Sequence, residues 1–461
     1  MSALWSSDEI AASTGGTASQ PFEVGGVTFD SREVQPGDLF VAMPGTVHDG
    51  HEFVDAAFAS GAAGAIVSQP VSGPHVLVEE VSAALQALGR ASRERSRATI
   101  IGVTGSVGKT STKEALYAAI ERCRPGSVHR SVKSYNNHTG VPLSLARMPR
   151  DAEYAVLEMG MNNQGEIAAL TRQVRPHLAL ITAIAPAHIE NLGSEEAIAD
   201  AKAEIFDGLE PGGVAIIPND TPHRDRLVKA ARRHAERIIT FGGGDADVHA
   251  VHAVSAEGGG SLISAALLER ELTFTISQRG DHWVSNSLAV LAAVEALGAD
   301  VAVAALALAD MGALKGRGER HLIDLDGGEA LLIDESYNAN PASMAATLRS
   351  LGQERDAQRR IAVLGPMREL GEHSDELHAG IAPAVLEARV DRLILIGEEM
   401  RPLADALDAL TDVGRADGVE QATDMLLQLL RPGDAVLVKA SNSVGLAQLV
   451  ERVVRAQTCS T

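Results

Sequence analysis

Residues 104–112 of the chain read TGSVGKTST. An apolar and β-branched run precedes this stretch at 99–103, and a run compatible with a helix follows it at 113–120. A strand, a glycine-rich turn, Lys-Thr and a helix form the layout of a phosphate-binding loop, in which backbone N–H groups and the helix N-terminus face a polyphosphate. In this layout Lys109 reaches the outer phosphates and the Thr110 hydroxyl binds Mg²⁺. The stretch therefore predicts a nucleotide phosphate site.

The glycine spacing of this loop differs from the general pattern, which places a glycine five residues before Gly108. That position is Val103, and the other glycines stand at 102 and 105. We interpret the loop as a shortened variant. The alternative is a glycine-rich turn that binds nothing, but the turn, the lysine, the hydroxyl and the flanking elements all agree with a phosphate site.

Length and composition limit the class of protein. At about 150 residues per domain, 461 residues indicate about three domains. The net charge of -21 argues against a nucleic-acid partner. The two cysteines, Cys123 and Cys459, form no disulfide framework and fit a reducing compartment. We see no signal peptide and no apolar run near the roughly 18 residues of a membrane span, so we expect a cytoplasmic protein without membrane insertion.

Strands alternate with helices along the chain, which predicts an α/β fold with mostly parallel sheets. We expect a small α/β domain at 1–98, a central nucleotide-binding domain at 99–315 and a third α/β domain at 316–461. The sequence GRGER at 316–320 would be the hinge between the last two. The third domain has no GxGxxG stretch, so a dinucleotide fingerprint is missing there.

Glu158 is the first candidate metal ligand outside the loop. It directly follows a compact apolar strand at 154–157. Open α/β sheets bind ligands at the carboxyl ends of their strands, and Mg²⁺ prefers oxygen ligands. The alternative is a solvated acid at the end of a strand.

Lys202 is the second candidate, because it lies in the apolar stripe of a helix that begins after Ser194. A lysine between Ile198 and Ile205 must either extend its charge to solvent or lose it. A neutral amine can take up CO₂ and form a carbamate, which resembles a carboxylate ligand. From the residues alone, a lysine that reaches solvent is the more ordinary interpretation, and a lone His188 is likewise more often structural.

Several polar loops could contact a nucleotide or a substrate. Asn-rich loops are more often structural, because their side chains satisfy nearby backbone groups. Asp30, Ser31 and Arg32 by themselves read as a turn after a strand. The other candidates in such stretches are Asn136, Asn137, Asn286, Asp334, Tyr337, Asn338 and Asn340.

Seven stretches, in order along the chain, together resemble the Mur ligase family, whose members build the peptide of bacterial cell walls. They are GVTGSVGKTSTKE at 102–114, NNHTGVP at 136–142, LEMGM at 157–161, AHIENLGSEEAIADAKAEIF at 187–206, GDHWVSN at 280–286, GRGER at 316–320 and DESYNANP at 334–341.

The resemblance implies a UDP-substrate domain, a central ATPase and a C-terminal Rossmann-like domain. It implies ATP-dependent formation of an amide bond through an acyl phosphate. It also implies that the protein is a monomer. The DESYNANP, NNHTGVP and TGSVGKT stretches point to UDP-N-acetylmuramoyl-tripeptide and D-alanyl-D-alanine as the substrates.

Site residues follow from the resemblance position by position. Lys109, His188 and Lys202 would be catalytic. Thr110 and Glu158 would hold one Mg²⁺, and His188 with a carbamylated Lys202 would hold a second. The phosphates would meet Gly105, Ser106, Val107, Gly108, Lys109, Thr110 and Ser111. The adenosine or the closing of the domains would involve Asn286, Arg317, Asp334, Tyr337, Asn338 and Asn340. The uridine side would involve Asp30, Ser31 and Arg32, and the muramoyl peptide Asn136 and Asn137.

The chain departs from the family pattern at a few positions. Ser111 replaces the usual threonine and keeps the hydroxyl. In the third domain Pro366 stands where the family usually has Asp, while Ala440, Asn442 and Val444 stand where it more often has Gly, Arg and Met. Two rival functions stay open: a sister amide ligase, such as one that adds diaminopimelate or lysine or a folylpolyglutamate synthetase, and a nucleotide-binding regulatory protein without turnover.

Overall fold

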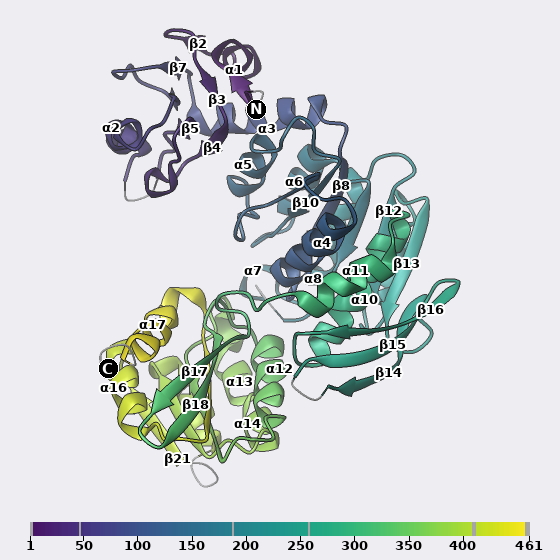
Figure 1. Ribbon diagram of the computed structural model, residues 1–461, viewed down its shortest axis with the longest axis vertical. Coiled ribbons are helices and arrows are strands. Elements are labelled where there is room, and N and C mark those ends of the chain that lie inside the picture. Colours follow the sequence, from purple (N-terminus) through teal and green to yellow (C-terminus); the bar gives the residue numbers. More distant parts are fainter. Residues whose placement is uncertain (1–2, 46–47, 187–188, 257–258, 408–411, 457–461) are drawn as a thin grey trace.

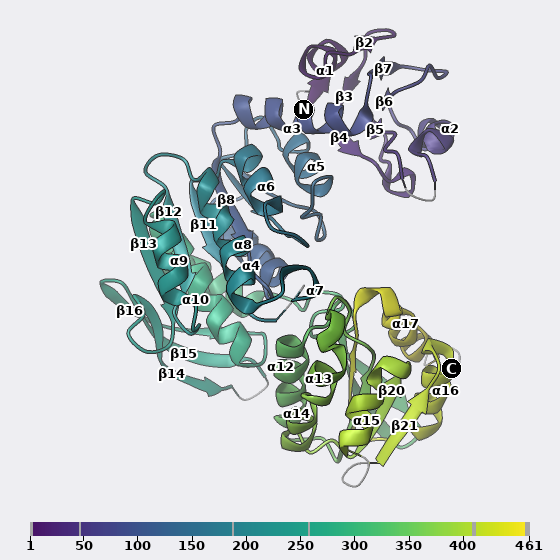
Figure 2. The ribbon, with the colours of Figure 1, turned by 180° about the vertical axis from the view of Figure 1, so that it is seen from behind.

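Three large sheets, one in each third of the chain, organise the molecule (Figure 1). The computed structural model describes residues 3–45, 48–186, 189–256, 259–407 and 412–456. The central domain lies between the other two, so that the molecule is a crescent with the N- and C-terminal domains at its ends (Figures 1 and 2). The predicted α/β architecture of three domains is confirmed. In the described residues, no helix is long and apolar enough to cross a membrane.

The N-terminal domain is built on a five-stranded sheet of order β2-β7-β6-β5-β4, parallel except for β2. The strand expected before Asp30 is β4, and it is followed by a 3-10 turn that Asp30 caps. The elements are β1 Trp5–Ser6, α1 Ser7–Thr14, β2 Thr17–Ala18, β3 Glu23–Val24, β4 Gly26–Thr28, β5 Asp38–Val41, α2 Val54–Ala59, β6 Gly64–Val67, β7 His75–Leu77 and α3 Val81–Arg95.

The central domain has a nine-stranded sheet of order β16-β15-β14-β13-β12-β11-β8-β10-β9. Strands β8 to β14 are parallel, and β15 and β16 extend the sheet in antiparallel fashion. The strands are β8 Thr99–Thr104, β9 Val128–Arg130, β10 Tyr154–Glu158, β11 Leu178–Ile181, β12 Val214–Pro218, β13 Arg237–Gly242, β14 Val248–Ser255, β15 Ser261–Leu267 and β16 Arg270–Ile276. The helices are α4 Lys109–Cys123, α5 Gly140–Ala146, α6 Glu166–Val174, α7 Ile189–Leu192, α8 Glu195–Ala203, α9 Arg224–Ala231, α10 Asp281–Ala296 and α11 Val301–Asp310.

Helices cover both faces of the central sheet, which explains the continuous apolar run before the loop. Along β8, Ile101 and Val103 pack with α4, α10 and α11. Ile100 faces the other side and packs with α5, α6 and α8. A strand that is buried on both faces has no need of polar alternation. Strand β11 ends at Ile181, and the chain then turns to contact the phosphate-binding loop through Thr182 and Ala183.

The C-terminal domain has a six-stranded sheet of order β17-β18-β22-β19-β20-β21, parallel except for β17. Helices α12, α14 and α15 pack on one face, and α16 and α17 pack on the other. The elements are β17 Glu319–Leu325, β18 Gly328–Glu335, α12 Pro341–Gly352, β19 Arg359–Leu364, α13 Ser374–Ala379, α14 Ala382–Glu387, β20 Arg392–Ile396, α15 Arg401–Leu407, β21 Asp412–Ala416, α16 Val419–Leu429, β22 Asp434–Lys439 and α17 Leu446–Ala456.

The sequence did not predict strands β17 and β21. Both lie at the edges of the C-terminal sheet, where one side of the strand has no partner strand and apolar patterning is weak. The GRGER stretch was interpreted as a hinge, but its last two residues already belong to β17.

Candidate functional site

The backbone of the loop at 104–112 requires glycine at two positions. Gly105 has φ of 147° and Gly108 has φ of 81°, conformations that side chains disfavour. A Cβ on Gly105 would lie 2.0 Å from the Thr182 hydroxyl, so the loop approaches the end of β11 too closely for any other residue. Gly108 is the N-cap of α4, which leaves the N-terminus of a 15-residue helix open to an anion.

The residues after β11 hold the loop in place. The Ser106 N–H donates to the carbonyl of Ala183 at 2.8 Å, and the Ser106 hydroxyl accepts from the N–H of Ala185 at 3.1 Å. The Thr182 hydroxyl donates to the carbonyl of Val107 at 2.5 Å. The loop is therefore fixed on a rigid sheet, as a site that positions phosphates requires.

Lys109 folds back over the loop. Its Nζ donates to the carbonyl of Gly105 at 2.7 Å. Burial lowers the pKa of Lys109, while the nearby carboxylate of Glu158 opposes that shift. Ser111 is buried one residue beyond Thr110 on α4. A cation enclosed by backbone N–H groups is suited to the negative charge of a polyphosphate.

Thr110 and Glu158 meet at the carboxyl end of β10. The Thr110 hydroxyl donates to Oε2 of Glu158 at 2.8 Å, and Nδ2 of Asn136 donates to Oε1 at 2.7 Å. Glu158 is 0% exposed, so the alternative of a solvated acid is wrong. A buried carboxylate beside a hydroxyl, next to a phosphate-binding loop, provides the oxygen ligands that fit Mg²⁺.

Lys202 is completely buried, with 0% exposure, so the interpretation of a lysine that reaches solvent is also wrong. Its Nζ has no hydrogen-bond partner within the described part of the chain. Burial, helped by the charge of Lys109, lowers the pKa of Lys202 well below its ordinary value. A buried amine with a lowered pKa and no hydrogen-bond partner among the described residues fits the expected reaction with CO₂. His188, the other predicted ligand, lies outside the described residues.

The C-terminal domain reaches into this site through Arg317. Its Nη2 donates to the Thr110 hydroxyl at 3.1 Å, and its guanidinium lies 4.1 Å from the ring centroid of Tyr337. The Tyr337 hydroxyl forms a hydrogen bond with the Ser134 hydroxyl of the central domain. The structure thus brings the GRGER and DESYNANP stretches to the phosphate-binding loop.

Asn286 and Asp334 lie in different positions relative to the loop. Asn286 packs against it, because a Cβ on Gly108 would lie 3.0 Å from Asn286 Oδ1. Asp334 is buried at the end of β18 and accepts the N–H of Ser336 at 2.9 Å. Asp334 therefore shapes the turn that carries Tyr337, and its hydrogen bond is local to that turn.

Two asparagines of the DESYNANP stretch have structural partners. Asn340 caps α12, and its Oδ1 accepts the N–H of Ser343 at 2.9 Å. The Asn338 carbonyl accepts from Nζ of Lys439 at 2.8 Å. Sequence reasoning missed Lys439, which is buried at the end of β22 and pairs with Glu335 at 3.4 Å. A lysine that directly follows a strand of apolar residues was the signal that could have identified it.

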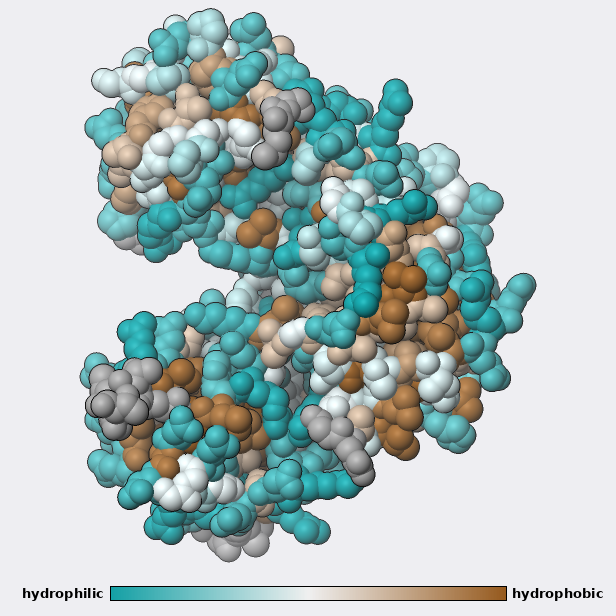
Figure 3. Space-filling view, in the orientation of Figure 1, coloured by the Kyte–Doolittle hydropathy of each residue, from teal (hydrophilic) through white to brown (hydrophobic). Residues whose placement is uncertain are grey.

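The predicted substrate residues of the first two domains also have local partners. Asp30 forms a bidentate pair with the exposed Arg32, at 2.8 and 2.7 Å, and Ser31 begins the turn between them. Asn137 Oδ1 accepts the N–H of Gly140 at 2.9 Å. Figure 3 shows a deep hollow between the N- and C-terminal domains.

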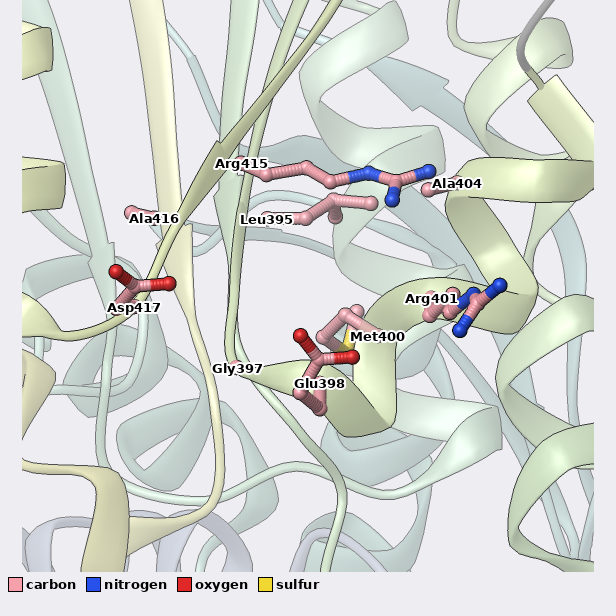
Figure 4. Close-up of a pocket in the computed structure, with 9 residues that line it drawn as sticks. All are labelled: Leu395, Gly397, Glu398, Met400, Arg401, Ala404, Arg415, Ala416 and Asp417. Carbon is pink, nitrogen blue, oxygen red and sulfur yellow. The ribbon is translucent and has the colours of Figure 1, made fainter.

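A separate cavity of about 210 Å³ lies in the C-terminal domain (Figure 4). It opens at the carboxyl ends of β20 and β21, and it contains none of the predicted site residues. Its lining residues are Leu395, Gly397, Glu398, Met400, Arg401, Ala404, Arg415, Ala416 and Asp417.

Family models cover most of the chain and define its class. The Mur ligase middle domain matches residues 103–294, the Mur ligase glutamate ligase domain matches 316–442, and the catalytic domain of the Mur ligase family matches 23–119. The chain therefore belongs to the Mur ligase family.

Within the family, the chain is similar over nearly its full length to ligases of one type. The chain is 34% identical over 444 residues to the UDP-N-acetylmuramoyl-tripeptide–D-alanyl-D-alanine ligase of Synechocystis sp., and this match covers 94% of the chain and 93% of the relative. It is similar to the crystal structure of MurF from Acinetobacter baumannii, with a TM-score of 0.84, 29% identity and coverage of 98% and 99%. The MurF ligase from Thermotoga maritima, solved in complex with ADP, has a TM-score of 0.76 at 27% identity and coverage of 95% and 98%.

Proposed function

We propose that this chain joins D-alanyl-D-alanine to UDP-N-acetylmuramoyl-tripeptide, with conversion of ATP to ADP and phosphate, in peptidoglycan precursor synthesis. The observation that carries the proposal is the buried Thr110–Glu158 pair at the phosphate-binding loop, together with the buried Lys202, whose Nζ has no hydrogen-bond partner among the described residues. The similarity to the UDP-N-acetylmuramoyl-tripeptide–D-alanyl-D-alanine ligase of Synechocystis sp. supports the choice of substrates.

The chemistry follows from the charges that the loop can neutralise. An oxygen of the tripeptide carboxylate attacks the γ-phosphorus of ATP, and ADP leaves. Lys109 and the backbone N–H groups of the loop hold the phosphates while this transfer brings anions together. The free amine of the dipeptide then attacks the acyl carbon, phosphate leaves and the nitrogen loses a proton. The acyl phosphate is therefore the activated form of the carboxylate, and the amide forms from it.

Thr110 and Glu158 would hold Mg²⁺, and a carbamylated Lys202 with His188 would hold a second ion. When bound, such ions neutralise the transferred phosphoryl group and align donor with acceptor. The protein would contribute the buried amine of Lys202, which reacts with CO₂ only when the amine is neutral. The nitrogen bonds to the carbon of CO₂, and the resulting carbamic acid loses a proton.

The remaining assignments belong to the same proposal. Arg317 and Tyr337 would meet the nucleotide when the domains close, together with Asn286, Asp334, Asn338 and Asn340. Asp30, Ser31 and Arg32 would bind the uridine side of the substrate, and Asn136 and Asn137 the muramoyl peptide. The protein would act as a monomer.

The test is to incubate the purified protein with ATP, Mg²⁺ and UDP-N-acetylmuramoyl-tripeptide, with and without D-alanyl-D-alanine, and to weigh the products by mass spectrometry. We expect a pentapeptide product and release of phosphate that depends on the dipeptide. A panel of other amines, including diaminopimelate, lysine and glutamate, decides between this ligase and its sister enzymes. Binding of ADP without any product would favour the regulatory alternative.

A further inference from the structure

Residues 131–137, which we name the junction segment, contact all three domains. Lys133 pairs with Glu33 of the N-terminal domain, and the Ser134 hydroxyl bonds to Tyr337 of the C-terminal domain. Within the central domain, Asn136 donates to Glu158 at 2.7 Å. This segment therefore connects the nucleotide site to both outer domains through direct contacts.

The junction segment belongs to no helix or strand, and only its first residue is bonded to the backbone of β10: the Ser131 N–H donates to the carbonyl of Val156 at 3.0 Å, and the Ser131 hydroxyl accepts the N–H of Glu158 at 3.1 Å. It follows β9 and precedes α5, so its backbone carbonyls lie outside any regular ladder. Lys133 has φ of 52°, a left-handed conformation that costs free energy in a residue other than glycine. Such a backbone persists only where the surroundings hold it in place.

Lys113 provides that support. Its Nζ donates to the carbonyl of Ser131 at 2.8 Å and to the carbonyl of Lys133 at 2.5 Å. It is 0% exposed, and it pairs with Glu114 at 2.9 Å. The other oxygen of Glu114 contacts Nε of Arg130, the residue before the segment, at 3.0 Å. A buried cation thus satisfies two carbonyls that would otherwise be unpaired.

Lys113 and the phosphate-binding residues share one rigid helix. Lys109 and Thr110 form the first turn of α4, and Lys113 follows Thr110 by three residues, which places the two on neighbouring positions of one helix face. We infer that Lys113 is a positioning residue that sets the junction segment, and with it the UDP-substrate, relative to the phosphates. This inference rests on the proposed function.

We expect the loss of Lys113 to affect the UDP-substrate and the nucleotide differently. The residues at 182–185 hold the phosphate-binding loop independently of Lys113, so nucleotide binding should survive its loss. Lys133 and Ser134, which contact the two outer domains, should lose their fixed positions, and a misplacement of about 1 Å can cost roughly a hundredfold in rate. A residue that only stabilised the fold would not separate these two quantities.

Arg93 offers a matched control. It is also a buried cation, and it donates to the carbonyls of Val174 and Arg175 at 2.7 and 2.8 Å and contacts Glu210 at 3.3 Å. These partners lie away from the phosphate-binding loop and the junction segment. Arg93→Met therefore removes the same kind of interaction without the proposed coupling.

The experiment compares wild type, Lys113→Met and Arg93→Met in the full-length chain. We expect Lys113→Met to raise the KM for UDP-N-acetylmuramoyl-tripeptide by about tenfold or more, while the Kd of ADP, measured by calorimetry, changes less than about threefold. Arg93→Met should change both quantities less than about twofold at a comparable loss of Tm. Lys113→Arg, which can still donate to both carbonyls, should restore most of the KM.

Two results would overturn the inference: equal kinetics for Lys113→Met and Arg93→Met, or a parallel loss of ADP affinity. If Lys113→Met does not fold, Lys113→Gln keeps one donor and carries the same comparison. An inactive wild-type enzyme would refute the proposed function instead, and the Kd of the UDP-substrate would then decide the positioning role.

Discussion

Helices α4 and α8 of the central domain each bury a lysine completely, but the surroundings of the two side chains differ. Lys113 on α4 donates to two backbone carbonyls and pairs with Glu114. Lys202 on α8 has no hydrogen-bond partner for Nζ in the residues that the structure describes. Its pKa is lowered well below the ordinary value because burial disfavours the ammonium form.

The difference shows what burial of a lysine means chemically. A partnered amine keeps a fixed position and can order the groups around it. A buried amine without a hydrogen-bond partner lowers the stability of the folded protein as long as the amine is unmodified. Functional sites often retain groups that lower stability, because activity requires them. This contrast supports the proposed positioning role of Lys113 and the proposed reaction of Lys202 with CO₂.

The largest effect should come from Lys202→Met. Loss of a metal-binding carbamate should lower kcat at least about a hundredfold, which corresponds to roughly 3 kcal/mol of the activation barrier. The same change should leave the protein as stable or make it more stable, because it removes an unpartnered polar group. Ligase assays and urea denaturation measure the two quantities.

Lys229→Met is the control for this change, since Lys229 is exposed on α9. Enrichment with ¹³C-bicarbonate should give a carbamate NMR signal in wild type and in Lys229→Met, but not in Lys202→Met. A Lys202→Met enzyme with full activity would contradict the role of Lys202.

Lys113→Met should change stability in the opposite direction. It leaves two buried carbonyls without a donor and breaks an ion pair, so the free energy of unfolding should fall by about 2–4 kcal/mol. Urea denaturation of Lys113→Met and Lys202→Met side by side tests the contrast. If both variants shift the unfolding midpoint in the same direction, the two lysines do not differ as we argue.

The sequence predicted Lys202 better than Lys113, and the reason is pattern. Lys202 interrupts an apolar stripe, so helical spacing identified it as a candidate, although the residues alone favoured a lysine that reaches solvent. Lys113 lies among polar residues directly after the phosphate-binding loop, and its burial depends on a segment about 20 residues further along the chain. The partners of such a side chain depend on the tertiary structure, and a local sequence pattern does not predict them.

The same distinction applies to the fold. The strands β8, β10 and β22 were predictable because burial on both faces leaves an apolar run, and the cap at Asn340 was predictable from Asn-Pro. The edge strands β17 and β21 were not, since their pairing comes from one neighbour only. Within the site, the contact of Arg317 with Thr110 depends on how two domains pack and could not be derived from either stretch alone.

The pH dependence of stability should isolate the contribution of Lys202. Between the lowered pKa of Lys202 and the ordinary value of 10.5, the unfolded chain binds a proton that the folded chain does not. Stability of the unmodified protein should therefore rise with pH in that window, by up to about 1.4 kcal/mol per pH unit. Lys202→Met lacks this contribution, so in CO₂-depleted buffer the difference in unfolding free energy between the two proteins should change from pH 7 to pH 9.5. Parallel curves would show that Lys202 does not titrate in the window.

Lys113→Arg should have the smallest effect, because the role of Lys113 depends on donors and not on a neutral amine. An arginine carries more donors than the two carbonyls need, and the cost is the larger volume in a packed site, about 1 kcal/mol or less. Arg93→Lys is the reverse exchange at a site of the same design and should cost a similar amount. Both are measured by urea denaturation. A loss with Lys113→Arg as large as with Lys113→Met would mean that the shape of the lysine, rather than its two hydrogen bonds, holds the junction segment.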